Sequence, residues 1–167
     1  VKKKADIKET IFKHKSGLKV IPTSIHQESS LEWLETSKIK YVVDILKKEK
    51  DYFVLIDSSA GLTMTTTDVI KSADNMIIVT NPEIPAVTDA LKTSKLIEQM
   101  QKNVLGVIVT RSSYSKSEMP IENVKEMLEL PILGVVPEDK NVKNSVVMKD
   151  AVVHTHPRSK AARAYRK

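Results

Sequence analysis

The stretch Tyr52-Phe53-Val54-Leu55-Ile56-Asp57-Ser58-Ser59-Ala60-Gly61 decides the fold class that we expect for this chain. Its first five residues are apolar or aromatic throughout, which is the pattern of a β-strand covered on both faces. The run ends at Asp57, four residues before a glycine. Nucleotide triphosphatases use an acid in this place, beside a mobile loop, to order a Mg²⁺ shell. The stretch therefore predicts an α/β fold with a polar site where its strands end.

Alternating strand and helix patterns extend this prediction to the rest of the chain. The expected strands are residues 18–21, 52–56, 76–80, 104–110 and 132–136. The expected helices are residues 37–50, a helix that opens near Pro85, and residues 121–128. Repeated alternation predicts right-handed crossovers and a doubly wound, mainly parallel sheet with helices on both faces.

Composition fits one globular domain. The chain has 167 residues, of which 41% are hydrophobic and 29% charged, enough for a single core. It contains no cysteine, which excludes disulfides and thiol chemistry. No apolar run approaches the roughly 20 residues of a membrane span. The net charge of +6 is spread along the chain, and the basic segment 158–167 is expected to be a solvated terminal helix.

The expected strands all end in polar segments. In a parallel sheet these ends share one edge, where ligands bind, so a polar ligand site is predicted there. The segments are Pro22-Thr23-Ser24, Asp57-Ser58-Ser59-Ala60-Gly61, Thr80-Asn81-Pro82-Glu83, Thr110-Arg111 and Pro137-Glu138-Asp139. The phosphate loop G-x-x-x-x-G-K-[ST] does not occur in the sequence. Only one half of a nucleotide site is therefore recognisable.

Three short motifs are similar to those of one known family. Asp57-Ser58-Ser59-Ala60-Gly61 resembles the D-S-P-A-G segment of the MinD branch of the MinD/ParA ATPases. Val79-Thr80-Asn81-Pro82-Glu83, followed by Val87-Thr88-Asp89, resembles its T-N-P-E and V-x-D motifs, and Val136-Pro137-Glu138-Asp139 resembles its I-P-E-D. With residues 159–164 the resemblance covers essentially the whole chain, and it is nearest to the archaeal members.

This resemblance implies a deviant P-loop ATPase that dimerises around ATP and acts in placing the cell-division site or partitioning cargo. The implied cofactors of the complete protein are ATP and Mg²⁺. The matching residues are Asp57 as catalytic residue and water-mediated Mg²⁺ ligand, Ser58, Ser59, Ala60 and Gly61 as the switch loop, Thr110, Arg111, Pro137, Glu138 and Asp139 as the nucleotide-binding residues, and Glu83 and Asp89 at the dimer face.

The sequence also departs from the family pattern. Ser59 stands where the family usually has proline, and Thr110 where many members have asparagine. The strand and phosphate loop that open these proteins, and the amphipathic helix that ends many of them, do not occur in the 167 residues. We therefore expect residues 1–167 to form one nucleotide-binding domain that is truncated at both ends. By itself it is expected neither to hydrolyse ATP nor to bind it tightly.

The resemblance further implies a homodimer formed on ATP, a division-regulating protein as partner and a cytoplasmic location. Attachment to the inner face of the membrane is expected only if a terminal helix follows Lys167, and a nucleic-acid partner is not expected. Two other hypotheses stay open. One is a non-hydrolysing interaction module of the same fold, and the other is a ParA-like partition ATPase that acts on DNA, which a steep salt dependence of DNA binding would support.

Overall fold

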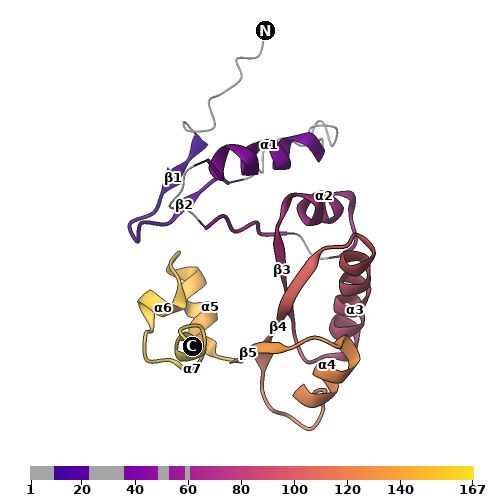
Figure 1. Ribbon diagram of the computed structural model, residues 1–167. Helices are drawn as coiled ribbons and strands as arrows, with labels where there is room; N and C mark the ends of the chain where they lie inside the picture. Colours follow the sequence, from indigo (N-terminus) through magenta and orange to yellow (C-terminus); the bar gives the residue numbers. More distant parts are fainter. Residues whose placement is uncertain (1–9, 23–35, 49–52, 59–60) are drawn as a thin grey trace. The chain divides into compact units, whose positions relative to one another are not determined.

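The computed structural model describes residues 10–22, 36–48, 53–58 and 61–167 (Figure 1). The chain forms two compact units, Val1–Asp57 and Ser58–Lys167. The first contains β1 (Phe12–Lys13), β2 (Lys19–Val20) and α1 (Thr36–Leu46). The second contains α2 (Met64–Ser72), β3 (Asn75–Thr80), α3 (Ile84–Gln99), β4 (Asn103–Ser112), α4 (Ile121–Leu128), β5 (Ile132–Pro137), α5 (Lys140–Val147), α6 (Val152–Thr155) and α7 (Lys160–Ala164).

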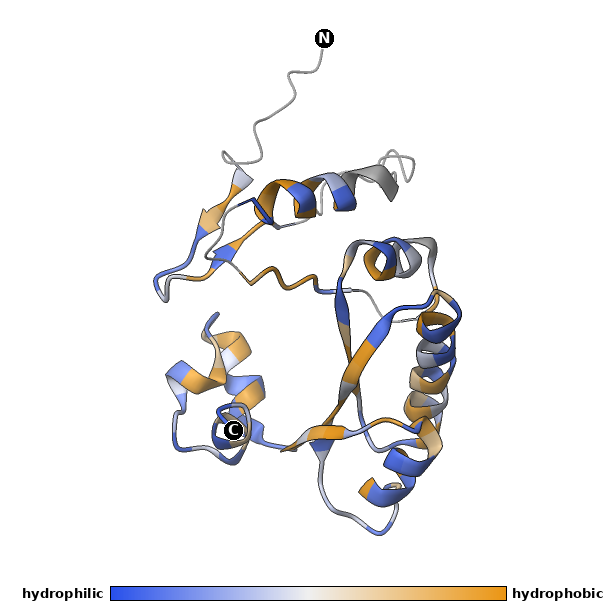
Figure 2. Ribbon diagram, viewed as in Figure 1, coloured by the Kyte–Doolittle hydropathy of each residue, from blue (hydrophilic) through white to orange (hydrophobic). Residues whose placement is uncertain are grey.

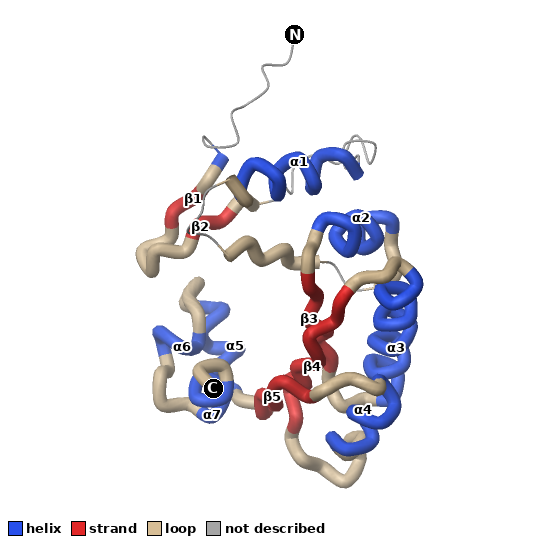
Figure 3. Tube along the Cα trace, viewed as in Figure 1, coloured by secondary structure: helices blue, strands red, loops and turns tan. Residues whose placement is uncertain are grey.

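A three-stranded parallel sheet organises the second unit. Its strands lie in the order β3, β4, β5, and both pairs are parallel. The strands predicted at 76–80, 104–110 and 132–136 are confirmed, each in a slightly longer form. Parallel neighbours need crossover connections, which α3 and α4 supply. Figure 3 shows the red strands flanked by blue helices, so the α/β fold with a parallel sheet is confirmed.

One face of this sheet forms the core of the second unit. Ile78, Val107 and Val109 on the strands are at most 6% exposed, and they join Val87 and Ile97 of α3 in one cluster. The spacing of the buried residues of α3 keeps them on one side of the helix. Full burial stabilises a valine side chain by about 1.5–3 kcal/mol. Packing under the helices therefore holds the strands in register.

The opposite face carries exposed apolar side chains. Ile77 is 47%, Val79 62%, Leu105 47% and Leu133 49% exposed. Figure 1 shows α5 to α7 near the end of β5, and Figure 2 shows orange apolar residues along the strands. The three short helices leave these side chains open. The expectation that the strands of this sheet have no solvent-facing side is wrong for the described residues, because α3 and α4 cover only one face.

The first unit contains a short hairpin where a buried strand was predicted. β1 and β2 pair in the antiparallel sense, with Phe12 opposite Val20. Gly17, at φ +88°, donates its N–H to the carbonyl of His14 and closes the turn. The predicted buried strand 18–21 is thus wrong, because this pair is two residues long and its side chains are exposed. The helix predicted at 37–50 ends earlier, at Leu46.

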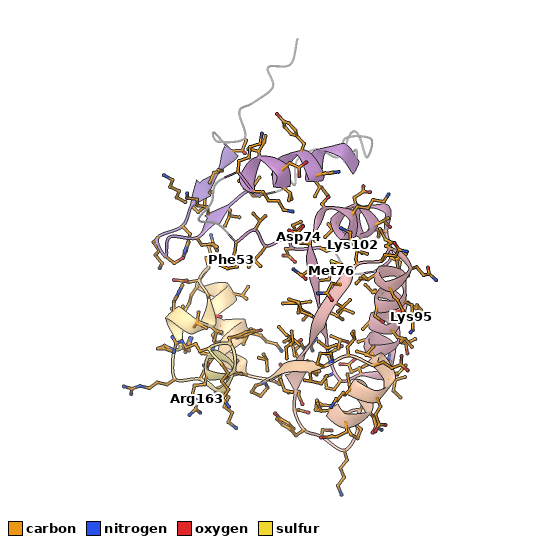
Figure 4. All side chains as sticks on the ribbon, viewed as in Figure 1. Phe53, Asp74, Met76, Lys95, Lys102 and Arg163 are labelled. Atoms are coloured by element: carbon orange, nitrogen blue, oxygen red, sulfur yellow. The ribbon has the colours of Figure 1, made fainter. Side chains whose placement is uncertain are left out.

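The strand predicted at 52–56 is also wrong for the residues that the structure describes. Residues 53–56 belong to no strand, with Phe53 101% and Leu55 89% exposed (Figure 4). Tyr52 itself lies outside the described residues. An apolar run becomes a strand only when its N–H and C=O groups find a neighbour. Within the part of the chain that the structure describes, none pairs with residues 53–56.

Of the helices that the structure describes, none has the length and hydrophobicity that a membrane crossing requires.

Candidate functional site

The parallel arrangement of β3, β4 and β5 brings their carboxyl ends to one edge of the sheet. We call this edge, formed by the segments 80–83, 110–113 and 137–139 in which the three strands end, the carboxyl edge. The hydroxyl of Thr110 donates to the carbonyl oxygen of Thr80 at 3.2 Å, which ties β4 to β3. The N–H of Glu138 donates to the carbonyl of Ser112 at 2.9 Å, which ties β5 to β4. Segments far apart in the sequence thus form one surface.

Arg111 and Glu138, predicted separately as nucleotide-binding residues, lie in contact here. Arg111 Nε is 3.4 Å from Glu138 Oε2, and Lys143 Nζ is 4.0 Å from Glu138 Oε1. The Arg111 and Glu138 side chains are 67% and 39% exposed, so the pair contributes little to stability. Both polar side chains remain open to a ligand.

The backbone at Arg111 has an uncommon conformation. Its φ of +58° lies in the left-handed region, which non-glycine residues seldom adopt. The β4–β5 register also shifts between Val109 and Ser112. Such irregularities bend a strand and redirect its side chains, and they are enriched beside binding sites. β4 therefore ends in an irregular stretch that includes Arg111 and runs two residues beyond the predicted strand 104–110.

Asp139 has a structural role that the sequence did not reveal. Its Oδ1 accepts the N–H of Asn141 in the first turn of α5 at 2.9 Å, and its Oδ2 accepts the N–H of Ala161 in α7 at 3.1 Å. These two backbone hydrogen bonds, that of Asn141 first, hold the pKa of the Asp139 carboxyl below its usual range. Both carboxylate oxygens are engaged, so Asp139 fastens two helices beside Glu138 instead of pointing to a ligand.

An open hollow of about 350 Å³ lies beside Asp139 and the helix starts to which it is hydrogen-bonded. Half of the side chains around it are basic, and the lining residues come from α5, α7 and the residues just before each of these helices (Figure 4 labels Arg163). They are Glu138, Asp139, Lys140, Asn141, Arg158, Ser159, Lys160 and Arg163. Sequence reasoning missed this hollow because three of its four basic residues, Arg158, Lys160 and Arg163, were assigned to a solvated helix. Ala161 and Ala162 of α7 are in fact fully buried.

Glu83 and Asp89 both belong to the start of α3. Glu83 is the N-cap residue and accepts the side-chain N–H of Asn81 at 2.9 Å, so it lies at the carboxyl edge. Asp89 is exposed on the same helix and forms an ion pair with Lys92 at 3.0 Å. The structure thus places both predicted dimer-face residues on the surface, and it gives neither of them a part in the core.

The predicted switch loop is described only in part. Ser58 and Gly61 are described, whereas Ser59 and Ala60 lie outside the described residues. Gly61 has a φ of +86°, and its carbonyl accepts the hydroxyl of Thr66 at 2.7 Å. A reciprocal pair of hydrogen bonds between Thr63 and Thr66 caps α2. The loop therefore leads directly into the capped start of a helix that sequence reasoning did not predict.

Asp57 is the last residue of the first unit and is exposed. Mg²⁺ prefers oxygen ligands and is usually bound through one or two carboxylates, waters and substrate phosphates. The exposed carboxylate fits that donor set. No cluster of three or more potential metal-binding side chains exists in the described ranges, so a Mg²⁺ ion held by Asp57 would depend on phosphate and water for its other ligands.

Comparison with known proteins gives consistent results. A family model described as an AAA domain matches residues 9–146. An uncharacterized ATP-binding protein of Methanocaldococcus jannaschii is 36% identical over 163 residues, which cover 96% of this chain and 60% of that protein. A second ATP-binding protein of that organism is covered to 61%, so the chain spans about 60% of the length of these curated relatives.

Solved structures show the same fold. The septum site-determining protein MinD from Pyrococcus horikoshii, complexed with Mg-ADP, has a TM-score of 0.84 at 27% identity, over 96% of this chain and 66% of that chain. A chain of the MinC:MinD cell division protein complex from Aquifex aeolicus has a TM-score of 0.83 at 25% identity, over 97% of this chain and 66% of that chain. The chain belongs to the MinD/ParA family of P-loop ATPases.

Proposed function

We propose that the whole protein is a MinD-like ATPase that binds ATP with Mg²⁺ at the carboxyl edge and dimerises on ATP to regulate placement of the division site. The observation that carries this proposal is the contact between Arg111 and Glu138. Two segments 27 residues apart meet where ligands bind to parallel sheets. The Pyrococcus horikoshii relative, which was solved with Mg-ADP, supports the choice of nucleotide.

Each predicted residue receives a role in this proposal. Thr110, Arg111, Pro137 and Glu138 surround the base, and Asp139 keeps Glu138 in place by fastening α5 and α7. Glu83 and Asp89 face the second copy of the protein. The Aquifex aeolicus complex of MinD with MinC supports a division-regulating protein as the partner.

The phosphate end of the site involves Asp57 and the switch loop Ser58, Ser59, Ala60 and Gly61. A bound Mg²⁺ supplies a charge that stabilises the phosphate oxygens during transfer. Asp57 would hold the metal through water, and Gly61, at φ +86°, would give the loop the freedom to follow the phosphate. The groups that hold the triphosphate itself are not found in the sequence of the 167 residues.

Steady-state ATP turnover and ATP affinity of the full-length protein test this proposal. Asp57→Ala should lower kcat about a hundredfold or more and change ATP affinity much less, because metal-mediated stabilisation acts on charge that develops in the transition state. Lys125→Ala, an exposed change on α4, is the matched control and should leave both values unchanged. Unchanged turnover in Asp57→Ala would show that this aspartate has only a structural role.

Two outcomes would favour the other hypotheses. Protein that binds ATP without turnover would be a non-hydrolysing interaction module. DNA binding that weakens steeply with salt would favour a partition ATPase, for which the basic residues of the hollow supply phosphate contacts.

A further inference from the structure

Glu118 makes a dense set of hydrogen bonds immediately after β4. Its carboxylate accepts the N–H of Ser113 at 2.9 and 3.1 Å, the N–H of Tyr114 at 3.1 Å and the hydroxyl of Ser112 at 3.2 Å. The hydroxyl of Ser113 donates to it as well. These bonds, that of the Ser113 hydroxyl first, hold the pKa of Glu118 below its usual range. The carboxylate therefore stays charged at neutral pH.

The backbone around this carboxylate has the form of an anion-binding nest. The N–H groups of Ser113 and Tyr114 are consecutive and converge on one carboxylate, and Tyr114 has a φ of +57°. Successive N–H groups in such conformations create a concave site for negative charge. Here the chain fills the nest with its own side chain. Glu118 thus holds the backbone of residues 113 and 114 through their N–H groups.

The loop around Glu118 is also hydrogen-bonded to the segment that follows β3. The N–H of Met119 donates to the carbonyl of Pro82 at 2.9 Å, and Pro82 is fully buried. Glu118 therefore lies between two parts of the carboxyl edge, the end of β4 and the segment after β3. Through Ser113 it determines the path of the chain only two residues beyond Arg111.

The conformation of Arg111 explains why such a fastening is needed. A non-glycine residue at φ +58° is under strain, and such strain persists only where the surroundings fix it. On one side the regular ladder of β4 holds Arg111, with Val109 fully buried. On the other side stand the buried Ser112 and the hydrogen bonds to Glu118. Without the hydrogen bonds to Glu118, the backbone at Arg111 can relax and move the Arg111 side chain away from Glu138.

We propose that Glu118 is a positioning residue for the nucleotide-base site. Its carboxylate holds residues 112–114 so that Arg111 stays against Glu138 and the edge of the adenine base finds its hydrogen-bonding partners. The proposal rests on the proposed function. Discrimination between bases depends on polar groups that stay unpaired with the wrong base, so a displaced Arg111 should weaken base selectivity more than phosphate binding.

The experiment compares Glu118→Ala and Glu118→Gln with Glu126→Ala, an exposed glutamate change on α4. Dissociation constants for ADP and GDP, each with Mg²⁺, are measured by calorimetry on the full-length protein. Glu118→Ala should raise the dissociation constant for ADP about tenfold and that for GDP much less, so the ADP-to-GDP ratio of dissociation constants rises. Glu118→Gln, which keeps one acceptor oxygen, should lie between, and Glu126→Ala should match the wild type.

Hydrogen exchange without nucleotide gives an independent readout. The amides of Ser113 and Tyr114 should exchange faster in Glu118→Ala than in the wild type. Wild-type protein that binds ADP and GDP equally overturns the proposed function and this proposal with it. An unchanged ADP-to-GDP ratio in Glu118→Ala, with a selective wild type, overturns only the role of Glu118. If Glu118→Ala does not fold, the ADP-to-GDP ratio of dissociation constants for Glu118→Gln tests the role of Glu118 in the same way.

Discussion

The helix-covered face of the β3–β4–β5 sheet and its carboxyl edge use the same three strands but are held by different forces. Under α3 and α4, Val87, Val107 and Val109 are fully buried, and apolar contacts dominate. At the edge, Arg111 and Glu138 are exposed, and hydrogen bonds hold the backbone beside them. The two regions therefore contribute to different properties, the covered face to stability and the carboxyl edge to ligand binding. Changes on the covered face should alter the free energy of unfolding, and changes at the edge should alter nucleotide affinity.

The largest effect on stability is expected at Gly106 in β4. A Cβ at this position would lie 2.5 Å from the carbonyl oxygen of Pro131, and the φ of Gly106 is +152°. The same carbonyl accepts the N–H of Val107, so it cannot move away freely. Gly106→Ala should lower the free energy of unfolding by about 3 kcal/mol. Urea denaturation of the 167-residue chain measures this value.

Gly134 in the neighbouring strand is the matched control. A Cβ there would meet no atom within 4 Å. Gly134→Ala should therefore change the urea midpoint far less than Gly106→Ala. Equal losses in the two variants would show that close packing between β4 and β5 does not hold the sheet together.

A somewhat smaller loss is expected from a cavity on the covered face. Val107→Ala removes two methyl groups from a fully buried position. The free energy of unfolding should fall by about 2 kcal/mol, from the lost transfer energy and the cavity together. Val147→Ala, at a site 83% exposed on α5, should stay within about 0.5 kcal/mol of the wild type. Similar losses in both would contradict the assignment of the core to this face.

Two adjacent acids at the edge give the sharpest contrast. Asp139→Ala removes the acceptor for Asn141 in α5 and Ala161 in α7 and should cost about 1 kcal/mol of stability. Glu138→Ala should leave stability nearly unchanged and weaken ADP binding. Thermal unfolding and calorimetric titration of both variants in the full-length protein check this. A stability loss in Glu138→Ala alone would reverse the assignment.

The contribution of Asp139 should also depend on pH. Its pKa is lowered in the folded protein, so the stabilisation is complete above the unfolded value of about 3.9 and is lost as the pH falls through the lower, folded value. The stability difference between wild type and Asp139→Asn should therefore be full at pH 7 and shrink below about pH 4. A difference that grows on acidification would contradict the hydrogen-bonded carboxylate.

The sequence predicted the elements whose pattern reflects local packing. The strands at 76–80 and 132–136 and the helix at 121–128 occur where alternation and helical spacing placed them. The run at 53–56 is as apolar as the middle of β3 but forms no strand among the described residues. An apolar composition indicates that a segment tends to be buried. A strand also needs a neighbouring strand to form hydrogen bonds, and the local sequence does not specify that neighbour.

The candidate site was predictable only in part, for a similar reason. The motifs identified Arg111 and Glu138, and the structure brings their side chains into contact. They could not show that Asp139 is engaged by two helices or that Glu118 fills a nest, because both facts depend on backbone N–H groups. Such partners are set by the folded path of the chain and not by side-chain spacing.

The most direct test of the central claim is to map ADP binding onto the amide resonances of the full-length protein. Titration with Mg-ADP should shift the amides of Arg111, Ser112 and Glu138 at the carboxyl edge and leave those of Glu126 and Leu130, near the far end of α4, unchanged. GDP at the same concentration should cause smaller shifts at Glu138. Shifts confined to residues away from the carboxyl edge, or none at Arg111 and Glu138 at saturation, would contradict the claim that this edge binds the nucleotide base.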